Sequence, residues 1–428
     1  MNFAKWETEE NMKKNIPLIG INGKTEVKAS GLPISYDDEY LYISDRINHS
    51  LVIGSTGSGK TQTMILPLLE LANKARESIV VHDTTNELYE KTKERFKKNG
   101  YNIIRLNFDD AMACNCWNPL ELPHRLYKEG NKDKAQDMLE ELAFYLLYDL
   151  EEVNSDPFWI NSAINYFTGL TLYAFENEKE VSLTTIKELD AFVNEKENEF
   201  KNKLDKNFSA YINLSGILNA PNETKGSIIS VFSQKIKKFI SKENLNKLLA
   251  KSDFDIANIA KEKTIIYAIS GNSSNSERLL PLLISQVYYA KDEYLKKEGK
   301  INIILDDFFE LYPIKNFAKM LNYSRSIYVT FTLMIRGFND LKNKYGKEET
   351  EILKICFGNL VYLLSQDIDT LEEISNLCGK TNEDGVVKAL ISVEELKTLK
   401  VFEAIIIMPR MMPIKTKLLP HYEMEKNL

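Results

Sequence analysis

The chain reads Gly54-Ser55-Thr56-Gly57-Ser58-Gly59-Lys60-Thr61 directly after the apolar run Leu51-Val52-Ile53. The spacing G-x-x-x-x-G-K-[ST] between a strand pattern and a helix pattern is typical of a phosphate-binding loop. The glycines allow backbone N–H groups to turn toward a polyphosphate, the lysine reaches the terminal phosphates, and the threonine hydroxyl can bind Mg²⁺. A glycine-rich turn with an exposed lysine is the alternative, but strand and helix patterns flank the loop in the correct order. We therefore predict that residues 54–61 bind a nucleotide, with Lys60 on the phosphates and Thr61 on the metal.

The composition is that of a globular protein without disulfides. The chain has 428 residues, of which 43% are hydrophobic and 27% charged, enough for two or three domains. Its net charge of −7 disfavours a protein that coats duplex DNA through bulk electrostatics. The four cysteines lack disulfide or zinc spacing, and no apolar run approaches the ~18 residues of a membrane helix. We expect a soluble, cytosolic chain with reduced thiols.

Short apolar runs mark a sheet on both sides of a long helical region. Residues 121–215 carry apolar side chains at helical spacing and almost no strand-like runs, which indicates an inserted all-α domain. Strands that are apolar on both faces and alternate with helices predict an α/β fold with a mainly parallel sheet covered by helices on both faces. The domains expected are a lead-in segment over 1–47, a nucleotide-binding domain over 48–120 and 216–428, and the all-α domain. Outside the helical region and beyond residues 51–53, the strand candidates are 40–43, 78–82, 102–106, 264–269, 301–305, 328–333, 360–364 and 404–408.

Two carboxylates follow the apolar run Ile303-Ile304-Leu305. A phosphate loop needs an acidic partner on a neighbouring strand, because Mg²⁺ must be held and a water molecule oriented. Asp306 is predicted to hold the metal, and Asp307 is predicted to polarise the attacking water. A solvated acidic turn after a strand is the alternative.

Several short motifs resemble, in their order, those of one family. They are Asn48-His49-Ser50-Leu51-Val52-Ile53-Gly54, Val81-His82-Asp83-Thr84-Thr85-Asn86-Glu87-Leu88-Tyr89, Cys116-Trp117-Asn118-Pro119-Leu120, Asp156-Pro157-Phe158-Trp159, Ser252-Asp253-Phe254-Asp255, Leu305-Asp306-Asp307-Phe308, Ser324-Arg325-Ser326, Tyr345-Gly346 and Pro409-Arg410-Met411-Met412-Pro413. The chain from about residue 45 to 422 thus resembles the type IV coupling proteins of conjugation and type IV secretion. The resemblance implies a RecA-like P-loop ATPase that assembles as a homo-hexamer and carries an inserted all-α domain.

The resemblance also implies a function and partners. It implies ATP-powered recruitment and translocation of single-stranded DNA with its relaxase, or of protein effectors, toward membrane-embedded channel subunits at the inner face of the bacterial membrane. ATP and Mg²⁺ are the implied cofactors. Arg325 matches the position of an arginine finger acting on a neighbouring subunit, where it would stabilise charge on the γ-phosphoryl oxygens. A surface arginine paired with an acidic side chain is the alternative.

The sequence departs from the family pattern at catalytic positions. Asp307 stands where the family usually has glutamate, and Arg336 stands where a glutamine that senses the γ-phosphate is usual. Thr85 and Asn86 replace a common lysine and glycine. The family's N-terminal membrane helices have no counterpart before the phosphate loop, which is expected either of a soluble member that docks on a separate membrane subunit or of a chain from which the membrane part was removed. The changes at Asp307 and Arg336 predict intact nucleotide binding and weak turnover.

Three functions follow as hypotheses. The first is an ATP-driven coupling motor, the second is a hydrolytically weak nucleotide-binding adaptor that recruits substrate through the all-α domain, and the third is a related packaging motor. The densest basic stretch, from Lys235 to Lys251, is interrupted by glutamate and asparagine, and a solvated helix face explains it better than a DNA-binding surface.

Overall fold

The structure is a computed structural model that describes residues 3–20, 26–44, 47–149, 156–206, 208–271 and 273–427. The chain divides into two compact units. The first contains Met1–Ile103, Asn258–Tyr267 and Lys291–Leu428, and the second contains Ile104–Ala257 and Ala268–Ala290.

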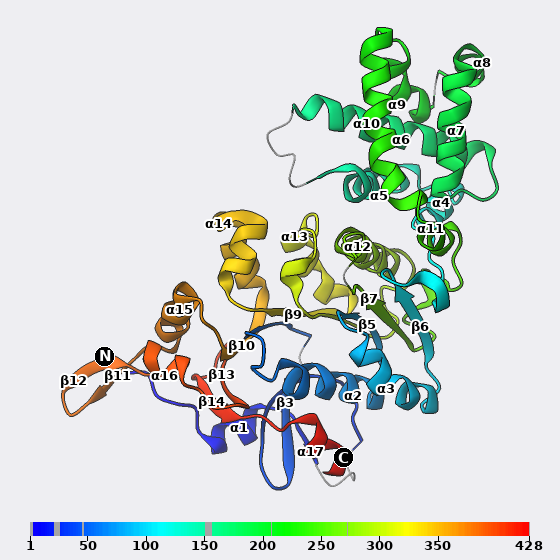
Figure 1. Cartoon of the computed structure of the whole chain (residues 1–428). Coiled ribbons are helices and arrows are strands. Elements are labelled where there is room, and N and C mark those ends of the chain that lie inside the picture. The colour runs from blue at the N-terminus through cyan, green and yellow to red at the C-terminus, as the bar shows by residue number, and fades with distance from the viewer. Residues whose placement is uncertain are drawn as a thin grey trace. The chain divides into compact units, whose positions relative to one another are not determined.

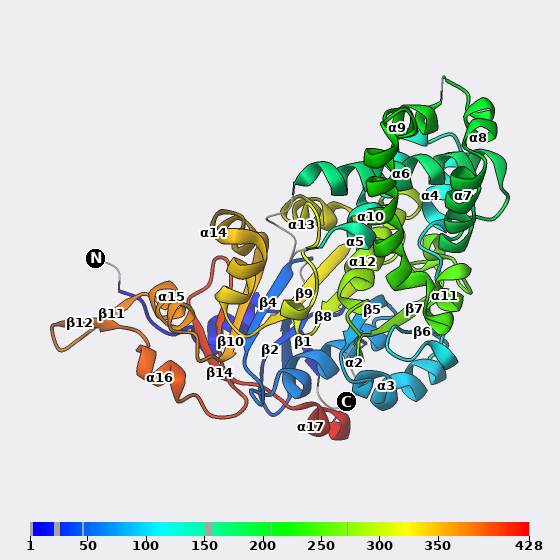
Figure 2. The same ribbon diagram turned by 45° about the horizontal axis from the view of Figure 1, so that its top comes forward.

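A nine-stranded sheet, counted over the described ranges, has the order β14-β13-β10-β4-β9-β8-β5-β7-β6, and Figure 2 shows its central strands β10, β4, β9, β8 and β5 in a row. Strand β4 pairs in parallel with β10 and β9, and β8 pairs in parallel with β9 and β5. Strand β13 is antiparallel to both β10 and β14. The predicted α/β fold with a mainly parallel sheet is therefore confirmed. The strands are β4 (His49–Gly54), β5 (Ser78–Asp83), β6 (Asn102–Asn107), β7 (Thr264–Ile269), β8 (Ile301–Leu305), β9 (Val329–Ile335), β10 (Phe357–Leu364), β13 (Glu403–Ile407) and β14 (Ile414–Lys417).

Helices cover both faces of this sheet, with α2 and α3 on one face and α13 and α14 on the other (Figure 1). Side chains alternate along each strand, so that Val52 and Ile304 belong to the core under α2 and α3. On the opposite face the Phe317 ring packs edge-on against Phe331, with centroids 5.5 Å apart, and stacks near Tyr345. The helical segments of the first unit are α1 (Glu9–Asn15), the π-helix η1 (Thr61–Ile65), α2 (Leu66–Lys74), α3 (Glu87–Lys98), η5 (Phe308–Glu310), α13 (Phe317–Ser324), η6 (Arg325–Ile327), α14 (Phe338–Cys356), α15 (Ile368–Cys378), α16 (Val393–Lys397) and α17 (His421–Asn427).

Local sequence signals explain the start of one helix and a break inside another. Ser392 and Glu395 form a reciprocal capping box at the start of α16, which satisfies two backbone N–H groups. Gly346 takes a positive φ of 77° within α14 and breaks its helical geometry. A two-stranded hairpin, β11 (Lys380–Glu383) and β12 (Val386–Ala389), connects α15 to α16.

The lead-in segment forms more structure than its sequence predicted. It contains a three-stranded antiparallel sheet in the order β1-β3-β2, of which only β3 had a recognisable pattern. The strands are β1 (Leu18–Gly20), β2 (Leu32–Tyr36) and β3 (Tyr40–Ser44). Ile34 and Tyr42 from β2 and β3 join the core beneath α2, so this segment forms part of the first unit.

A buried carboxylate ties the lead-in segment to the main sheet. The Ser30 N–H donates to Glu77 Oε1 at 3.0 Å. Asn302 Nδ2 donates to Glu77 Oε2 at 2.7 Å, and Lys300 Nζ lies 3.2 Å from the same oxygen. Because Lys300 also donates to the Ser30 carbonyl, at 3.0 Å, this cluster joins three distant parts of the chain.

The second unit is built mainly of helices. Helix α6 packs against α5, α9 and α10, and the buried Asp190 accepts a hydrogen bond from Tyr166 Oη at 3.1 Å in this core. The helices continue past residue 215, through α10 and α11, and the domain boundaries inferred from the sequence remain a prediction. The helical segments are η2 (Ala111–Ala113), α4 (Glu121–Lys128), α5 (Lys132–Leu147), α6 (Pro157–Asn177), α7 (Leu183–Glu195), α8 (Glu197–Lys203), α9 (Ser209–Leu218), α10 (Asn222–Ile240) and α11 (Glu243–Ala250). They are followed by η4 (Ile256–Asn258) and α12 (Ser276–Tyr294), whose last residues belong to the first unit.

Among the described residues, no helix has both the length and the apolar character needed to cross a membrane.

We predict that Glu77→Ala destabilises the first unit by about 3 kcal/mol, because it leaves the Lys300 ammonium buried without its partner. The measurement is urea unfolding of both proteins. The control is Lys388→Ala, which breaks an exposed pair with Glu383 and should cost far less, because solvent screens surface pairs. Equal losses in the two variants would contradict a structural role for the Glu77 cluster.

Candidate nucleotide-binding site

A cavity of about 490 Å³ lies at the carboxyl ends of β4, β5 and β8. It brings Lys60 and Thr61 of the predicted phosphate loop together with Asp306 and Asp307, as their sequence context led us to expect. Strand β9 separates β8 from β4, so the acidic residues are two strands from the loop and not on the adjacent strand. The cavity is lined by Ser55, Thr56, Gly57, Ser58, Gly59, Lys60, Thr61, Gln62, Asp83, Thr84, Thr85, Glu87, Leu88, Asp306, Asp307, Val401 and Phe402.

The loop backbone explains its glycines. Gly57 and Gly59 have φ values of 79° and 93°, a conformation that residues with a Cβ rarely adopt. A Cβ on Gly54 would lie 2.4 Å from Ser58 Oγ, so this close turn also requires glycine. Ser58 Oγ and Gln62 Oε1 are buried, and neither atom has a hydrogen-bond partner within the described part of the chain. The hydroxyl of Ser58 can therefore donate to a phosphate oxygen without breaking an existing bond.

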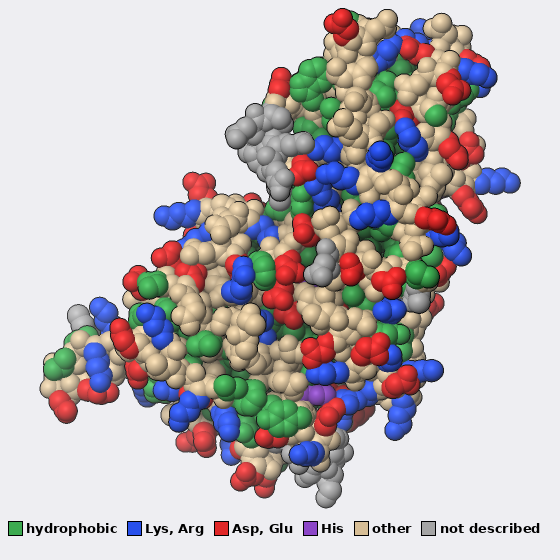
Figure 3. Space-filling model, viewed as in Figure 1, with side chains coloured by type: hydrophobic (Ala, Val, Ile, Leu, Met, Phe, Trp, Pro, Cys, Tyr) green, Lys and Arg blue, Asp and Glu red, His purple; other side chains and the backbone are tan. Residues whose placement is uncertain are grey.

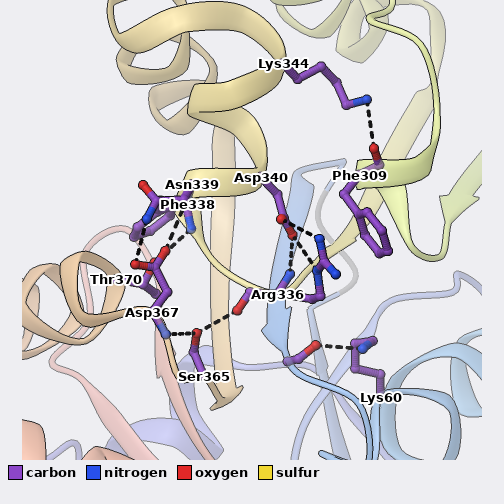
Figure 4. A network of polar contacts seen from close by, with 11 residues as sticks. Lys60, Phe309, Arg336, Phe338, Asn339, Asp340, Lys344, Ser365, Asp367 and Thr370 are labelled. Atoms are coloured by element: carbon purple, nitrogen blue, oxygen red, sulfur yellow. Dashed lines mark hydrogen bonds and ion pairs between the residues drawn. The ribbon is translucent and has the colours of Figure 1, made fainter.

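The Lys60 ammonium lies over the same loop. Its Nζ donates to the carbonyl oxygen of Gly54 at 2.6 Å, an interaction drawn in Figure 4. Thr61, the next residue, begins the π-helix η1 that leads into α2. π-helical turns within or beside α-helices are frequent at functional sites.

Asp306, on the acidic side of the cavity, has a raised pKa. Burial, together with the charge of Asp307, raises the pKa of Asp306 to about 6, although Lys60 acts in the opposite direction. Asp307 has a φ of 45° in the left-handed region, and its N–H donates to Asp306 Oδ1 at 3.0 Å. The backbone at the end of β8 therefore holds the Asp306 carboxyl group.

Two residues at the end of β5 complete this side. Asp83, for which we had predicted no role, lines the cavity and accepts a hydrogen bond from the Tyr89 N–H at 2.8 Å; burial raises its pKa. His82 Nδ1 donates to the Asp306 carbonyl at 2.5 Å, and burial lowers the His82 pKa to about 4, so the ring is neutral. These bonds fix the end of β5 beside the end of β8. Asp83 stands at the end of an apolar strand pattern, as Asp306 does. This shared pattern was the signal that could have identified Asp83.

Asn86 explains one departure from the family pattern. It has a φ of 65° immediately before α3, in the left-handed region. Asparagine tolerates this conformation better than most residues, so it can stand where the family commonly has glycine.

The donors fit Mg²⁺ bound together with phosphates. Mg²⁺ typically takes one or two protein oxygens and completes its octahedron with phosphate oxygens and water. Thr61 and Asp306 supply a hydroxyl and a carboxylate in this cavity. Among the described residues, this cavity included, no group of three or more histidine, cysteine, aspartate or glutamate side chains is arranged to hold a metal by itself.

Arg325 does not line this cavity. It begins η6, which precedes β9. Burial lowers the pKa of His49, the first residue of β4, and the charge of Arg325 adds to this effect. Since the phosphate loop follows the last residue of β4, Arg325 lies at the opposite edge of the sheet. Its side chain is exposed.

Arg336 follows β9 and does not line the cavity. Its guanidinium pairs with Asp340 at 3.1 Å and lies 3.4 Å from the centroid of the Phe309 ring (Figure 4). The Ser365 hydroxyl also donates to the Arg336 carbonyl, at 2.7 Å. Binding a phosphate through this guanidinium would therefore require breaking an ion pair and a ring contact.

The basic stretch of the helical unit is largely neutralised by nearby carboxylates. Lys235 is buried and lies 3.6 Å from Asp149, and Lys238 lies 3.2 Å from the same carboxylate. Lys247 pairs with Glu243 at 2.6 Å. On the face drawn in Figure 3, basic and acidic side chains are interspersed. These pairs favour the solvated-helix interpretation over a DNA-binding stripe.

We predict that Asp306→Asn stabilises the nucleotide-free protein at pH 7.5 by on the order of 3 kcal/mol. The folded-state pKa of about 6 lies above the ordinary aspartate pKa of 3.8, so the folded protein loses stability as the pH rises through that window. The gain of the variant should therefore shrink as the pH is lowered toward 4. Urea unfolding at pH 7.5 and pH 5 measures it, with the exposed Asp369→Asn as the control. A gain that does not depend on pH would contradict this assignment.

The comparisons with known proteins agree with the fold. A profile described as type IV secretory system conjugative DNA transfer matches residues 1–384. No curated protein sequence matches significantly. The bacterial conjugative coupling protein TrwBdeltaN70 with sulphate has a TM-score of 0.70 and 14% identity, over 98% of this chain and 94% of that chain.

Two further solved structures have the same fold. The plasmid coupling protein TrwB in complex with ADP and Mg²⁺ gives a TM-score of 0.67 and 16% identity, over 98% of this chain and 94% of that chain. VirB4 of Thermoanaerobacter pseudethanolicus gives 0.60 and 13%, over 92% of this chain and 98% of that chain. The resemblance drawn from the motifs is thus confirmed, and the chain belongs to the family of type IV secretory system proteins of conjugative DNA transfer.

Proposed function

We propose that this chain is an ATP-driven coupling protein that recruits single-stranded DNA with its relaxase, or a protein substrate, and moves it toward a membrane channel. The observation that carries the proposal is the convergence of the phosphate loop with Asp306 and Asp307 in one cavity. Membership of the conjugative DNA transfer family supports the transport role. The TrwB structures with ADP and Mg²⁺ and with non-hydrolysable analogues of ATP and of GTP support the binding of a purine nucleotide.

The roles of the binding residues follow from their chemistry. Backbone N–H groups of residues 54–61 surround the phosphates, and Lys60 gives up its bond to the Gly54 carbonyl for a terminal phosphate oxygen. Thr61 and Asp306 hold Mg²⁺, which neutralises charge on the phosphates. Because Asp306 must be ionised to bind a cation, its raised pKa makes this role pH-dependent.

Asp307 is proposed to orient and polarise the attacking water. Its left-handed backbone fixes the direction of a side chain one methylene shorter than glutamate. A base must come within about 3 Å of the proton donor, or act through one more water, so the shorter chain slows the reaction.

A hydrolytically weak adaptor is the second candidate function, and the position of Arg336 favours it. The guanidinium is engaged by Asp340 and Phe309, so no side chain at this position is poised to sense the γ-phosphate. In this case nucleotide binding would organise the protein for substrate recruitment without efficient turnover.

Arg325 is proposed to act on the nucleotide of a second copy. It lies at the amino edge of the sheet, while the cavity lies at the carboxyl edge, so it is remote from the cavity of its own chain. A head-to-tail contact between copies would place one chain's Arg325 at the next chain's phosphates, and such contacts close into rings, here proposed as a hexamer.

Single-turnover ATP hydrolysis with and without single-stranded DNA tests the two functions. The motor predicts that the wild type hydrolyses ATP, that DNA accelerates the reaction, and that Lys60→Ala lowers it by at least about 100-fold. Lys347→Ala, an exposed lysine on α14, is the matched control. A rate near zero in the wild type that rises in Asp307→Glu would instead support the adaptor.

Mixing two inactive variants tests whether Arg325 acts between copies. Lys60→Ala keeps the arginine, and Arg325→Ala keeps the phosphate loop. In rings assembled on single-stranded DNA from equal amounts of both, roughly a quarter of wild-type activity should return, because an intact loop then faces an intact arginine. Each variant alone provides the control. A mixture as inactive as its components would contradict action between copies.

A further inference from the structure

One wall of the nucleotide cavity is apolar and was not anticipated from any motif. It is formed by Val401 and Phe402, in the turn between α16 and β13. The Val401 side chain is 62% exposed, and Phe402 is half-buried. An exposed apolar pair beside charged and polar lining residues requires an explanation other than core packing.

The sheet register explains how this turn reaches the phosphate loop. Strand β13 is antiparallel to β10, and their paired residues include Tyr362 and Ile405. Leu364, at the end of β10, pairs with Gly54 at the end of β4. The residues just before β13 therefore emerge at the edge where the loop begins. A Cβ on Gly59 would lie 3.2 Å from Cδ1 of the Phe402 ring, so ring and loop are in close contact.

The apolar wall and the carboxylates lie on opposite sides of β4. Strands β8 and β5, which carry Asp306 and Asp83, follow β9 on one side, and β13 follows β10 on the other side. A triphosphate whose terminal group is at the Asp306 end must direct its nucleoside away from that end. The apolar surface available to a base in that direction is the Val401–Phe402 pair.

The backbone at this turn is strained and firmly held. Phe402 has a φ of 72°, which is a true outlier for a bulky aromatic residue. The Leu418 N–H donates to its carbonyl at 2.8 Å, and the Glu403 N–H donates to the Lys400 carbonyl at 2.9 Å. Strain of this kind persists where the surrounding structure over-determines a conformation, and it gathers at ligand sites.

From these observations we propose that Val401 and Phe402 form the base platform of the site, with the Phe402 ring stacking on the face of a purine. The inference rests on the proposed nucleotide function and deepens it. Both platform side chains lack hydrogen-bonding groups, so they recognise a flat aromatic face and not the edge of a particular base. The ligand class is a purine nucleoside triphosphate, with adenine and guanine accepted almost equally.

Calorimetric titration with ATP and with inorganic tripolyphosphate, both in Mg²⁺, separates base binding from phosphate binding. Phe402→Ala should weaken ATP binding about 10- to 100-fold and leave tripolyphosphate binding unchanged, since it removes only the stacking surface. Phe402→Trp should restore ATP binding, which also shows that the first variant is not simply unfolded. Lys60→Ala should weaken both ligands and is the control for the phosphate end.

Three results would overturn the platform. The first is an equal loss of ATP and tripolyphosphate binding in Phe402→Ala, because the ring would then act only by supporting Gly59. The second is unchanged ATP binding in Phe402→Ala. The third is a wild-type preference of more than about 100-fold between ATP and GTP, which stacking alone does not produce. A wild type that binds neither ATP nor tripolyphosphate would remove the proposed function itself, and is therefore distinguishable from a failure of the platform alone.

Discussion

The site depends on the parallel direction of β4, β9, β8 and β5. Parallel strands deliver the residues that follow them to one edge of the sheet, so a loop after β4 and carboxylates after β8 and β5 meet although they are far apart in the chain. The cavity therefore combines backbone N–H groups and an ammonium with four carboxyl groups, those of Asp83, Glu87, Asp306 and Asp307. Burial and mutual repulsion make ionisation of Asp306 costly, and a bound cation relieves that cost.

Much of this arrangement could be predicted from the sequence because its signals are local. Buried parallel strands are continuous apolar runs, and each run that we identified became a strand within a few residues of its expected ends. The phosphate loop has a fixed spacing, and Asp306 directly ends a strand pattern. The order of strands is not a local property, so the position of β9 between β4 and β8 could not be foreseen. Strands β1 and β14 are short, and their sequences carried no recognisable pattern.

Other features depend on contacts that no single stretch encodes. Val401 and Phe402 reach the cavity only because β13 reverses direction beside β10. Arg336 contacts Asp340, four residues later in the chain, and the ring of Phe309, in the segment after β8. The first contact has the i, i+4 spacing of helix ion pairs and could have been recognised, whereas the second requires the folded sheet.

The placement of Arg325 and the phosphate loop at opposite edges has a consequence for how copies work together. If Arg325 acts on the nucleotide of the adjacent copy, each chain supplies a phosphate loop at one edge of its sheet and an arginine at the other edge. No chain then forms a complete site alone. An open row of copies then always leaves one triphosphate without its arginine, however long the row becomes. Only a closed ring uses the arginine and the phosphate loop of every chain. The subunit that closes the ring would therefore raise the rate of ATP hydrolysis more than any earlier subunit.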